Sequence, residues 1–451
     1  MLTVRSSQSE DPQAFLGNDD QYWQLDGILT DRDLSKRIVA EGRSPEVAAR
    51  EVATPEPVTI QSDETVFDAM LCMLRNNLHH LPVLHRRRPV GVLHLSDIVR
   101  FDTHSSLYLV SSIFSQTSVR GLERLMPDVR AAYVRLVDEG ANSEMIGTAM
   151  ATIGRSLIRR LIALAEEDLG PPPVPYCFMV LGSMARNEQN IATDQDNALV
   201  LDDRFDPEAH DAYFAELARQ VSDGLAACGY HYCKGGIMAT NPSWRQPLAT
   251  WKRYFREWIA DPQPKQLLHS SIFFDLDSAY GEERFVEELQ DLAAGEASKS
   301  PLFLAAMARN ALNRTPPLGF FRQFVMEQDG KQRNSINLKR RGTAPLVDLI
   351  RVHALACGST AQNSIQRLDA IADAHILPAG ATDRIRYALE FISMVRIRHQ
   401  AFDIREGRDP DNNIEPENIS DSERHHLKDA FQALSHAQKY LRFKYPFPSR
   451  R

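Results

Sequence analysis

The sequence lacks the features that identify most secreted and membrane proteins. Its five cysteines are scattered over 451 residues, and no two of them have the Cys-x-x-Cys spacing, which favours a reducing compartment over a disulfide scaffold. No apolar run approaches the ~18 residues that a membrane span requires, and the N-terminus has no apolar signal core. We therefore expect a cytoplasmic protein without a membrane partner.

Concentrated positive charge is also missing. The chain has 52 Lys and Arg against 60 Asp and Glu, a formal net charge of −8. Two short basic clusters, at 86–88 and 339–341, are more typical of a solvated surface than of contacts to a phosphate backbone, so we expect no nucleic-acid partner. Apolar residues make up an ordinary 43% of the chain, and its length predicts two or three globular domains.

The apolar pattern changes several times along the chain and predicts an α+β multidomain protein. Period-two and continuous apolar runs indicate strands, whereas spacing of three and four indicates helices. The expected segments are a disordered lead-in (1–20), a module of short strands and helices (21–102), a helical connector (103–172), an α/β domain (173–295) and a C-terminal helical bundle (296–451).

The first of these modules contains an internal repeat. Gly-Ile-Leu-Thr-Asp-Arg-Asp at 27–33 returns as Gly-Val-Leu-His-Leu-Ser-Asp at 91–97, which signals a duplicated unit. With His-His-Leu-Pro-Val at 79–83, it resembles a CBS-domain pair whose first copy is truncated. CBS pairs often bind adenine nucleotides, and the resemblance implies regulatory nucleotide contacts at Thr30, Asp33 and Asp97. A module that only packs or dimerises is the alternative, and we expect a homodimer.

A glycine-serine turn follows the first buried strand of the α/β domain. The apolar run Tyr176–Leu181 predicts that strand, and Gly182 allows the backbone to approach a ligand closely. Ser183 adds a hydroxyl, and the residues after it can open a helix whose N–H groups attract phosphate. Arg186 can supply a planar cation for phosphate oxygens. The turn is therefore a candidate phosphate-binding element.

Two carboxylates follow this turn. Asp194 and Asp196 project from one face of an extended chain, and their repulsion is relieved by a cation. Oxygen ligands of this kind suit Mg²⁺ or Mn²⁺ bound together with substrate phosphates. Asp275, in the apolar run Ser271–Leu276 that predicts a strand, is the first candidate for a third ligand, and Asp277 is its rival.

The order Gly-Ser, Asp-x-Asp and later buried Asp resembles the DNA polymerase beta nucleotidyltransferase superfamily. Within it, the chain is similar to nucleotidyltransferases related to PII-protein uridylyltransferases and linked to CBS domains. The further similar segments are Cys233–Pro242, Trp244, Phe273–Asp275, Pro317–Phe321, Asn337–Lys339, Pro345–Asp348 and Arg351. The resemblance covers almost everything from about residue 26 onward.

The resemblance implies an enzyme that transfers a nucleoside monophosphate from an NTP to an acceptor and releases pyrophosphate. By analogy with PII uridylylation, the acceptor can be a protein side chain. The residues assigned to catalysis and metal are Asp194, Asp196 and Asp275. The residues assigned to the nucleotide are Gly182, Ser183, Arg186, Gly235 and Gly236, of which the paired glycines fit a tight turn equally well.

Two non-enzymatic alternatives remain at this point. The protein can be a regulator that binds a nucleotide without turnover, because Asp277 stands where related proteins tend to have Arg and the CBS module is truncated. A structural scaffold would bind no nucleotide at all. Lys339 and Arg351 can face the active cleft from the helical domain, or they can form surface ion pairs.

Overall fold

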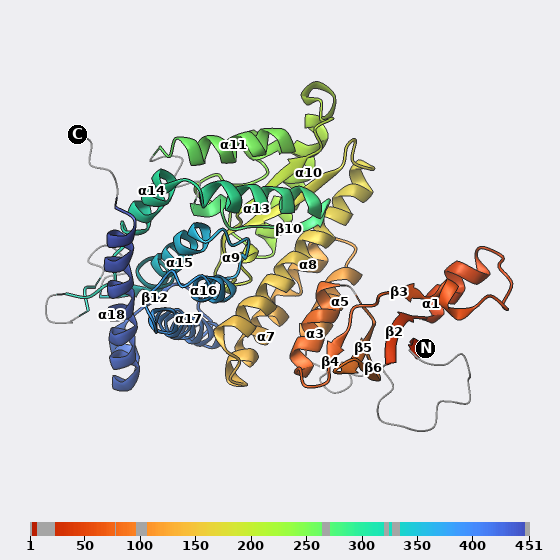
Figure 1. Ribbon diagram of the computed structural model, residues 1–451, viewed down its shortest axis with the longest axis horizontal. Helices are drawn as coiled ribbons and strands as arrows, with labels where there is room; N and C mark the ends of the chain where they lie inside the picture. Colours follow the sequence, from red (N-terminus) through yellow and green to blue (C-terminus); the bar gives the residue numbers. More distant parts are fainter. Residues whose placement is uncertain are drawn as a thin grey trace. The chain divides into compact units, whose positions relative to one another are not determined.

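The fold consists of two compact units, Met1–Ser111 and Ser112–Arg451 (Figure 1). The computed structural model describes residues 2–6, 23–76, 78–95, 106–263, 271–319, 324–326 and 334–446. Within these residues, no helix combines the length and apolar character that crossing a bilayer demands.

The first unit begins with a three-stranded antiparallel sheet. Its strands, in spatial order, are β1 (Leu2–Ser6), β2 (Trp23–Ile28) and β3 (Thr54–Pro55). Between β2 and β3 lie α1 (Asp31–Leu34), the π-helical turn η2 (Ser35–Val39) and α2 (Ala49–Val52). The sequence predicts a disordered lead-in over 1–20; residues 2–6 of it pair with β2, with a register shift between Thr3 and Val4, and the remainder of that segment lies outside the described residues.

A second sheet in this unit forms a β-α-β arrangement. It contains β4 (Ile60–Gln61), α3 (Val66–Arg75), β5 (His80–His85) and β6 (Arg88–His94), with β4 and β5 parallel and β5 and β6 antiparallel. Thr65 caps α3 reciprocally with Asp68, a pairing that satisfies two otherwise free N–H groups. Met70 and Met73 of α3 pack on Leu81 of β5, since residues three apart lie on the same face of a helix.

The second unit is built around a four-stranded sheet in the order β10, β7, β8, β9. Its strands are β7 (Tyr176–Leu181), β8 (Asn197–Leu201), β9 (Arg245–Pro247) and β10 (Leu276–Gly281). β7 is antiparallel to both β8 and β10, while β9 is parallel to β8. All residues of β7 and β8 are buried, in agreement with the continuous apolar run that predicts β7.

Alternate residues of β7 pack on opposite faces of this sheet. Tyr176 contacts Phe214 of α10 (Pro207–Ala227), with ring centroids 5.5 Å apart, and α10 packs beside α8 (Ser143–Leu169). Cys177 and Met179 belong to the large core that includes α11 (Leu248–Ala260) and α13 (Glu283–Ala297). The sheet is therefore covered on both faces, which explains why its central strands contain no alternating polar residues.

Helices dominate the rest of this unit. They are α5 (Ser106–Ser115), which begins in the first unit, α6 (Val119–Glu123), α7 (Met126–Asp138), α14 (Pro301–Ala311), α15 (Ala344–Ala356), α16 (Ser364–Asp373), α17 (Ala381–Arg405) and α18 (Asp421–Lys444). The π-helical turn η5 (Lys339–Thr343) precedes α15, and the short strands β11 (Ile336–Asn337) and β12 (Asn413–Ile414) pair with each other. The mixed architecture and the helical C-terminal region are confirmed, whereas the domain boundaries stay predictions.

One predicted strand is displaced. The sequence predicts a strand over 272–276, but residues 271–273 are helical and β10 begins only at Leu276. Phe273 lies 4.6 Å from Trp244 and Phe274 lies 5.1 Å from Phe303, measured between ring centroids. A short apolar run fits a buried helix end as well as a strand, and here aromatic packing decides between them.

A buried histidine in α15 makes the stability of this unit depend on pH. His353 is 1% exposed, its Nδ1 lies 3.1 Å from the Tyr445 hydroxyl, and its Nε2 has no hydrogen-bond partner in the described part of the chain. Burial, assisted by repulsion from Lys444, lowers the pKa of His353 to about 3. Since the unfolded chain binds this proton near pH 6.5, stability is complete above that pH and declines toward pH 3.

Replacing this histidine is expected to flatten that decline. The unfolding free energy of the wild type falls between pH 7 and pH 5. In His353→Gln this fall is expected to be smaller by about 2 kcal/mol, because no buried imidazole has to stay uncharged. Urea unfolding at both pH values measures the difference. The exposed His425→Gln serves as control and keeps the wild-type slope; identical slopes in all three proteins would contradict the argument.

Candidate active site

Three polar segments meet at one edge of the central sheet. β7 ends there, and β8 and β10 begin there because both run antiparallel to it. The Leu181 N–H donates to the Asp196 carbonyl, and the Gly182 N–H donates to the Asp275 carbonyl, each at 3.0 Å. Backbone pairing alone therefore fixes Asp196 and Asp275 on the two sides of the glycine-serine turn.

The turn and one of the predicted acids are in close contact. Gly182 begins the single helical turn α9 (Gly182–Ala185) with φ +58°, and a Cβ at this position would lie 3.4 Å from Oδ2 of Asp196. Only glycine adopts this backbone conformation without strain. The Asp196 carboxylate thus lies directly over the start of the turn, next to Ser183, whose hydroxyl has no hydrogen-bond partner among the described residues.

This contact predicts a sensitive glycine. Gly182→Ala is expected to lower stability by about 1 kcal/mol through the left-handed backbone. By displacing the Asp196 carboxylate, it is also expected to weaken metal-dependent nucleotide binding about ten-fold, a loss of about 1.4 kcal/mol. Thermal unfolding and equilibrium binding of an NTP measure the two effects. Gly295→Ala, in α13 where nothing lies within 4 Å of the added methyl, is the control; unchanged nucleotide affinity in Gly182→Ala would refute the assignment.

The two acids of the Asp-x-Asp motif share one side of an extended segment. Asp194 forms a parallel bridge with His231, and the Gln195 N–H donates to the His231 carbonyl at 2.8 Å. The side chain of Gln195 is buried and donates to the Ser222 and Tyr230 carbonyls. Asp194 is exposed and Asp196 half-buried, so the alternation places Gln195 inside and both carboxylates outside, as predicted.

Electrostatics and donor chemistry at this pair fit a hard divalent cation. Burial raises the pKa of Asp196, and Asp194 adds to the rise, while a hydrogen bond from the Cys233 thiol and the charge of Lys339 oppose it. Two carboxylates that repel each other, with only oxygen donors, are the ligand type that Mg²⁺ and Mn²⁺ prefer. A cation held there would relieve the repulsion that now disfavours the charged form of Asp196.

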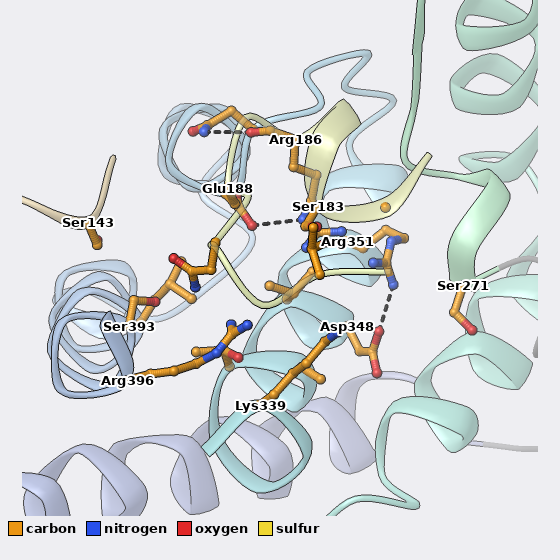
Figure 2. Close-up of a pocket in the computed structure, with 18 of the residues that line it drawn as sticks. Ser143, Ser183, Arg186, Glu188, Ser271, Lys339, Asp348, Arg351, Ser393 and Arg396 are labelled. Atoms are coloured by element: carbon orange, nitrogen blue, oxygen red, sulfur yellow. Dashed lines mark hydrogen bonds and ion pairs between the residues drawn. The ribbon is translucent and has the colours of Figure 1, made fainter. Parts of the chain in front are cut away.

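A cavity of about 410 Å³ opens beside this pair (Figure 2). Its volume lies in the range of small-molecule sites. Of the residues predicted from sequence, the cavity is lined by Gly182, Ser183, Arg186 and Asp196, and also by Lys339 and Arg351. Asp194, Asp275, Gly235 and Gly236 are not among its lining residues. The second unit therefore supplies every described wall of the cavity, from both its sheet edge and its C-terminal helices.

The position of Asp275 does not agree with the predicted role as a metal ligand. The side chain is fully buried, and three guanidinium groups bond its oxygens: Arg351 at 2.9 and 2.5 Å, Arg367 at 2.5 Å and Arg186 at 2.5 Å. Although burial alone would raise it, these charges hold the pKa of Asp275 far below its usual range. Both oxygens are occupied by arginine, so Asp275 connects α15, α16 and the turn to one another and has no oxygen left for a metal ion.

The rival carboxylate has a partner of its own. Asp277 accepts from Nη2 of Arg155 at 2.8 Å, and the same guanidinium donates to the Met184 and Ser278 carbonyls. Asp277 does not line the cavity. Of the four acids that the sequence nominates, Asp275 and Asp277 are thus paired with arginine, and the metal-binding role of Asp194 and Asp196 stays a prediction.

The paired glycines form a tight turn. The Gly236 N–H donates to the Cys233 carbonyl at 3.0 Å, and the Gly236 carbonyl accepts from Nε1 of Trp244 at 3.1 Å. This turn presents the Cys233 thiol to Asp196. The geometry accounts for Gly235 and Gly236 as shaping residues, and their contact with a nucleotide stays a prediction.

Supporting contacts hold the loop that follows the turn. A Cβ on Gly147 of α8 would lie 2.9 Å from the Asn187 carbonyl, so α8 packs directly on this loop. At the start of α16, the Asn363 amide donates to the Arg186 carbonyl at 2.9 Å, and the Ser364 N–H donates to Glu188 at 2.7 Å. The loop is therefore clamped between two helices that are distant in sequence.

Sequence reasoning missed two arginines on buried helix faces. Arg367 belongs to the buried face of α16 with Leu368 and Ile371, and Arg396 to that of α17 with Ile392. A charged residue at an apolar position of an amphipathic helix is rarely buried without a partner. An arginine at an otherwise apolar position of the helical pattern is therefore the sequence feature that could have identified them, and it indicates a buried ion pair or a ligand.

In the first unit, two of the three predicted regulatory residues lie together. Thr30 caps α1, and its N–H and hydroxyl donate to Oδ2 of Asp33 at 2.9 and 2.7 Å. The Thr54 hydroxyl donates to the other oxygen at 3.3 Å. Asp97 lies outside the described residues. The role of Thr30 and Asp33 in nucleotide binding stays a prediction.

A separate cluster, formed by α17 and the segment that follows it, also has metal-binding residue types. The donor atoms of His399, Asp403 and Asp411 all lie within 4.8 Å of one another. Arg408, however, donates to Asp403 at 2.8 Å, and this charge already neutralises the buried carboxylate. The cluster holds the segment around Asp411 against α17.

Three family models match the chain. The one described as "CBS domain" matches residues 49–104, and "Putative nucleotidyltransferase DUF294" matches 127–265. "Putative nucleotidyltransferase substrate binding domain" matches 301–445. The second match contains the turn and both acids, and the third contains the helices that close the cavity.

Curated relatives share a short part of the chain. It is 33% identical over 73 residues to "CBS domain-containing protein CBSCBSPB2" of Arabidopsis thaliana, 16% of this chain and 14% of that protein. Over 74 residues it is 32% identical to "CBS domain-containing protein YhcV" of Bacillus subtilis, 16% of this chain and 53% of that protein. The matched part spans about half or less of the length of these two relatives.

Proposed function

The chain belongs to the family of nucleotidyltransferases that carry a CBS domain, and from this premise we propose that it transfers a nucleoside monophosphate from an NTP to an acceptor with release of pyrophosphate. One observation carries the proposal: the Asp196 carboxylate lies against the Gly182–Ser183 turn at the wall of a cavity that also exposes several cationic side chains.

The residues around the turn have complementary tasks in this reaction. Asp194 and Asp196 would hold Mg²⁺ or Mn²⁺, which neutralises charge on the phosphates and activates the acceptor oxygen. Gly182 permits the close approach of the triphosphate, and the Ser183 hydroxyl donates to it. Lys339, which interacts electrostatically with both acids, stabilises the negative charge that develops on the leaving pyrophosphate.

Asp275 contributes by positioning. Its carbonyl accepts from Gly182, and its side chain holds Arg186 and Arg351, both of which line the cavity. Arg186 also pairs with Glu188 at 2.8 Å. Because the geometry of a nucleotide site tolerates little displacement, an ionic connection between sheet edge and helices keeps the turn in place.

The acceptor and the regulation follow by analogy. As in PII uridylylation, we propose a protein side chain as acceptor, and an adenine nucleotide at the CBS module near Thr30 and Asp33 as regulatory ligand. A homodimer is the proposed assembly. Coupling between module and active site requires two states that the ligand populates differently.

A second candidate function is a regulator that binds the nucleotide without turnover. The observation that favours it is the occupation of Asp275 by three arginines, which leaves two carboxylates where a two-metal site commonly has three. Both candidates predict metal-dependent nucleotide binding, and only the enzyme predicts transfer.

A transfer assay separates these functions. The protein is incubated with each α-labelled NTP, with Mg²⁺ or Mn²⁺, and with a cell extract as a source of acceptors. Transfer of label to a macromolecule with release of pyrophosphate is the expected result. Thermal stabilisation by NTP and metal without transfer would favour the regulator, and the absence of any stabilisation would refute nucleotide binding altogether.

A further inference from the structure

The cavity contains a buried cation without a counter-ion. Arg396 of α17 is 8% exposed and lines the cavity. Its Nε donates to Oδ1 of Asn412 at 2.6 Å, but its terminal nitrogens have no partner, and no carboxylate lies within ion-pair distance, in the described part of the chain. Burying a guanidinium without compensation is costly, so a ligand is the expected source of compensation.

A second cation without a counter-ion shares this space. Lys339 lines the same cavity, and its ammonium group forms no ion pair or hydrogen bond within the described ranges. Enclosure by the cavity walls lowers the pKa of Lys339, and repulsion from Arg396 lowers it further, against the attraction of Asp194 and Asp196. Lys339 therefore interacts electrostatically with both acids and with Arg396. The charged groups that act on Arg396 do not include the two acids. Figure 2 shows Lys339 and Arg396 reaching the cavity from different elements.

The other arginines of the cavity differ in this respect. Arg186 pairs with Glu188 and Asp275, while Arg351 and Arg314 both pair with Asp348. Each of these three arginines therefore has a carboxylate partner within the protein. Lys339 and Arg396 are thus distinguished by an uncompensated charge that faces the cavity.

One residue holds both of these cations in place. Asn412 accepts from Arg396 through its side chain, and its carbonyl accepts at 2.8 Å from the N–H of Leu338, which directly precedes Lys339. Gln400 donates to the Asn412 side chain at 3.2 Å. The two like charges are therefore held near each other before any ligand arrives, at the expense of mutual repulsion, and such an arrangement is typical of an anion site.

A hydroxyl completes the set. Ser393 lies one helical turn before Arg396, also lines the cavity and has no hydrogen-bond partner among the described residues. A guanidinium, an ammonium and a hydroxyl around one space provide directional donors for three or more oxygen lone pairs. This donor set fits a phosphate or carboxylate group.

We propose that Arg396, Lys339 and Ser393 bind an anionic group of the acceptor substrate, a phosphate or a carboxylate, while the NTP occupies the turn. This inference rests on the proposed transfer function. It places the acceptor group on α17, within the part of the chain that matches the substrate-binding domain model. Lys339 interacts electrostatically with both acids and with Arg396, so it can contact both reactants.

Equilibrium binding of small anions tests the proposal without turnover. The protein is saturated with Mg²⁺ and a non-hydrolysable NTP analogue, and inorganic phosphate or acetate is titrated in by calorimetry. Wild-type protein is expected to bind at least one of the two anions at one site. Arg396→Gln is expected to weaken that anion binding about ten-fold and to keep the affinity for the NTP analogue within about two-fold. The anion affinity of Arg396→Lys is expected to lie between those of wild type and Arg396→Gln.

Two further variants keep the test decisive. Lys339→Gln changes a solvent-accessible side chain, so it replaces Arg396→Gln in the test if that variant fails to fold. It is expected to weaken anion binding to a similar extent. Lys439→Gln, at an exposed position of α18, is the control. The proposal is overturned if neither anion binds wild-type protein, or if the variants leave the anion affinity unchanged. It is also overturned if Arg396→Gln weakens binding of the NTP analogue as strongly as binding of the anion, which would assign these cations to the triphosphate. If no NTP analogue binds, the proposed function fails by itself, and the same titration on nucleotide-free protein still decides whether this anion site exists.

Discussion

Replacing Asp194 and Asp196 by asparagine is expected to abolish nucleotidyl transfer while leaving the protein folded. The single variants lose at least about 10³-fold in rate, because each removes one charge from the cation that neutralises the transferring phosphate, an effect of about 4 kcal/mol or more. Stability is unchanged or slightly raised, since Asp194 is exposed and burial disfavours the charged form of Asp196. Label transfer and thermal unfolding measure the two results.

A second measurement distinguishes a loss of metal binding from a loss of the transfer reaction alone. Binding of Mn²⁺, followed by electron paramagnetic resonance in the presence of a non-hydrolysable NTP analogue, is expected to weaken in each variant and to vanish in the double variant. Asp291→Asn, an exposed carboxylate on α13, serves as control and keeps both Mn²⁺ binding and transfer. Transfer at the wild-type rate in the double variant would remove the Asp-x-Asp motif from the mechanism.

The sequence predicts the residues at the centre of the candidate site because the signals there are local. The run Tyr176–Leu181 reads as a buried strand whatever surrounds it, and the glycine at its end must have an unusual backbone to turn there. Asp194 and Asp196 share a face because extended chains alternate. Long periodic segments such as α10 and α17 were predictable for the same reason, since their apolar stripe repeats over several turns.

The role of Asp275 was not accessible in this way. A lone carboxylate in an apolar run indicates that another group compensates its charge. The sequence alone does not distinguish a metal ion from a guanidinium group as that compensating group. The compensating groups, Arg351 and Arg367, follow 76 and 92 residues later on helix faces whose orientation depends on tertiary packing. The displaced start of β10 has a similar origin, because aromatic contacts across the core decide between helix and strand over 271–276.

The prediction with the largest effect on stability concerns this same carboxylate. Asp275→Asn keeps the shape of the side chain but leaves three buried guanidinium groups around a neutral amide, and only Glu188 and Asp348 remain to balance them. Removing one partner of a buried ionic network typically costs 3–5 kcal/mol. We expect a loss of about that size in urea unfolding at pH 7, with Asp277→Asn as matched control, because the half-exposed Asp277–Arg155 pair is worth about 1 kcal/mol or less.

The same variant decides between a positioning role and a metal-binding role for Asp275. If the carboxylate positions the turn, Mn²⁺ affinity of the folded Asp275→Asn protein changes little at low temperature, whereas the nucleotide affinity falls because Arg186 and Arg351 lose their common anchor. If the carboxylate binds the cation, Mn²⁺ affinity falls as steeply as in the Asp196 variant and stability changes little. The ion pairs with Arg186, Arg351 and Arg367 require the first outcome, because a fully buried carboxylate bonded by three guanidinium groups has no free oxygen to offer a metal.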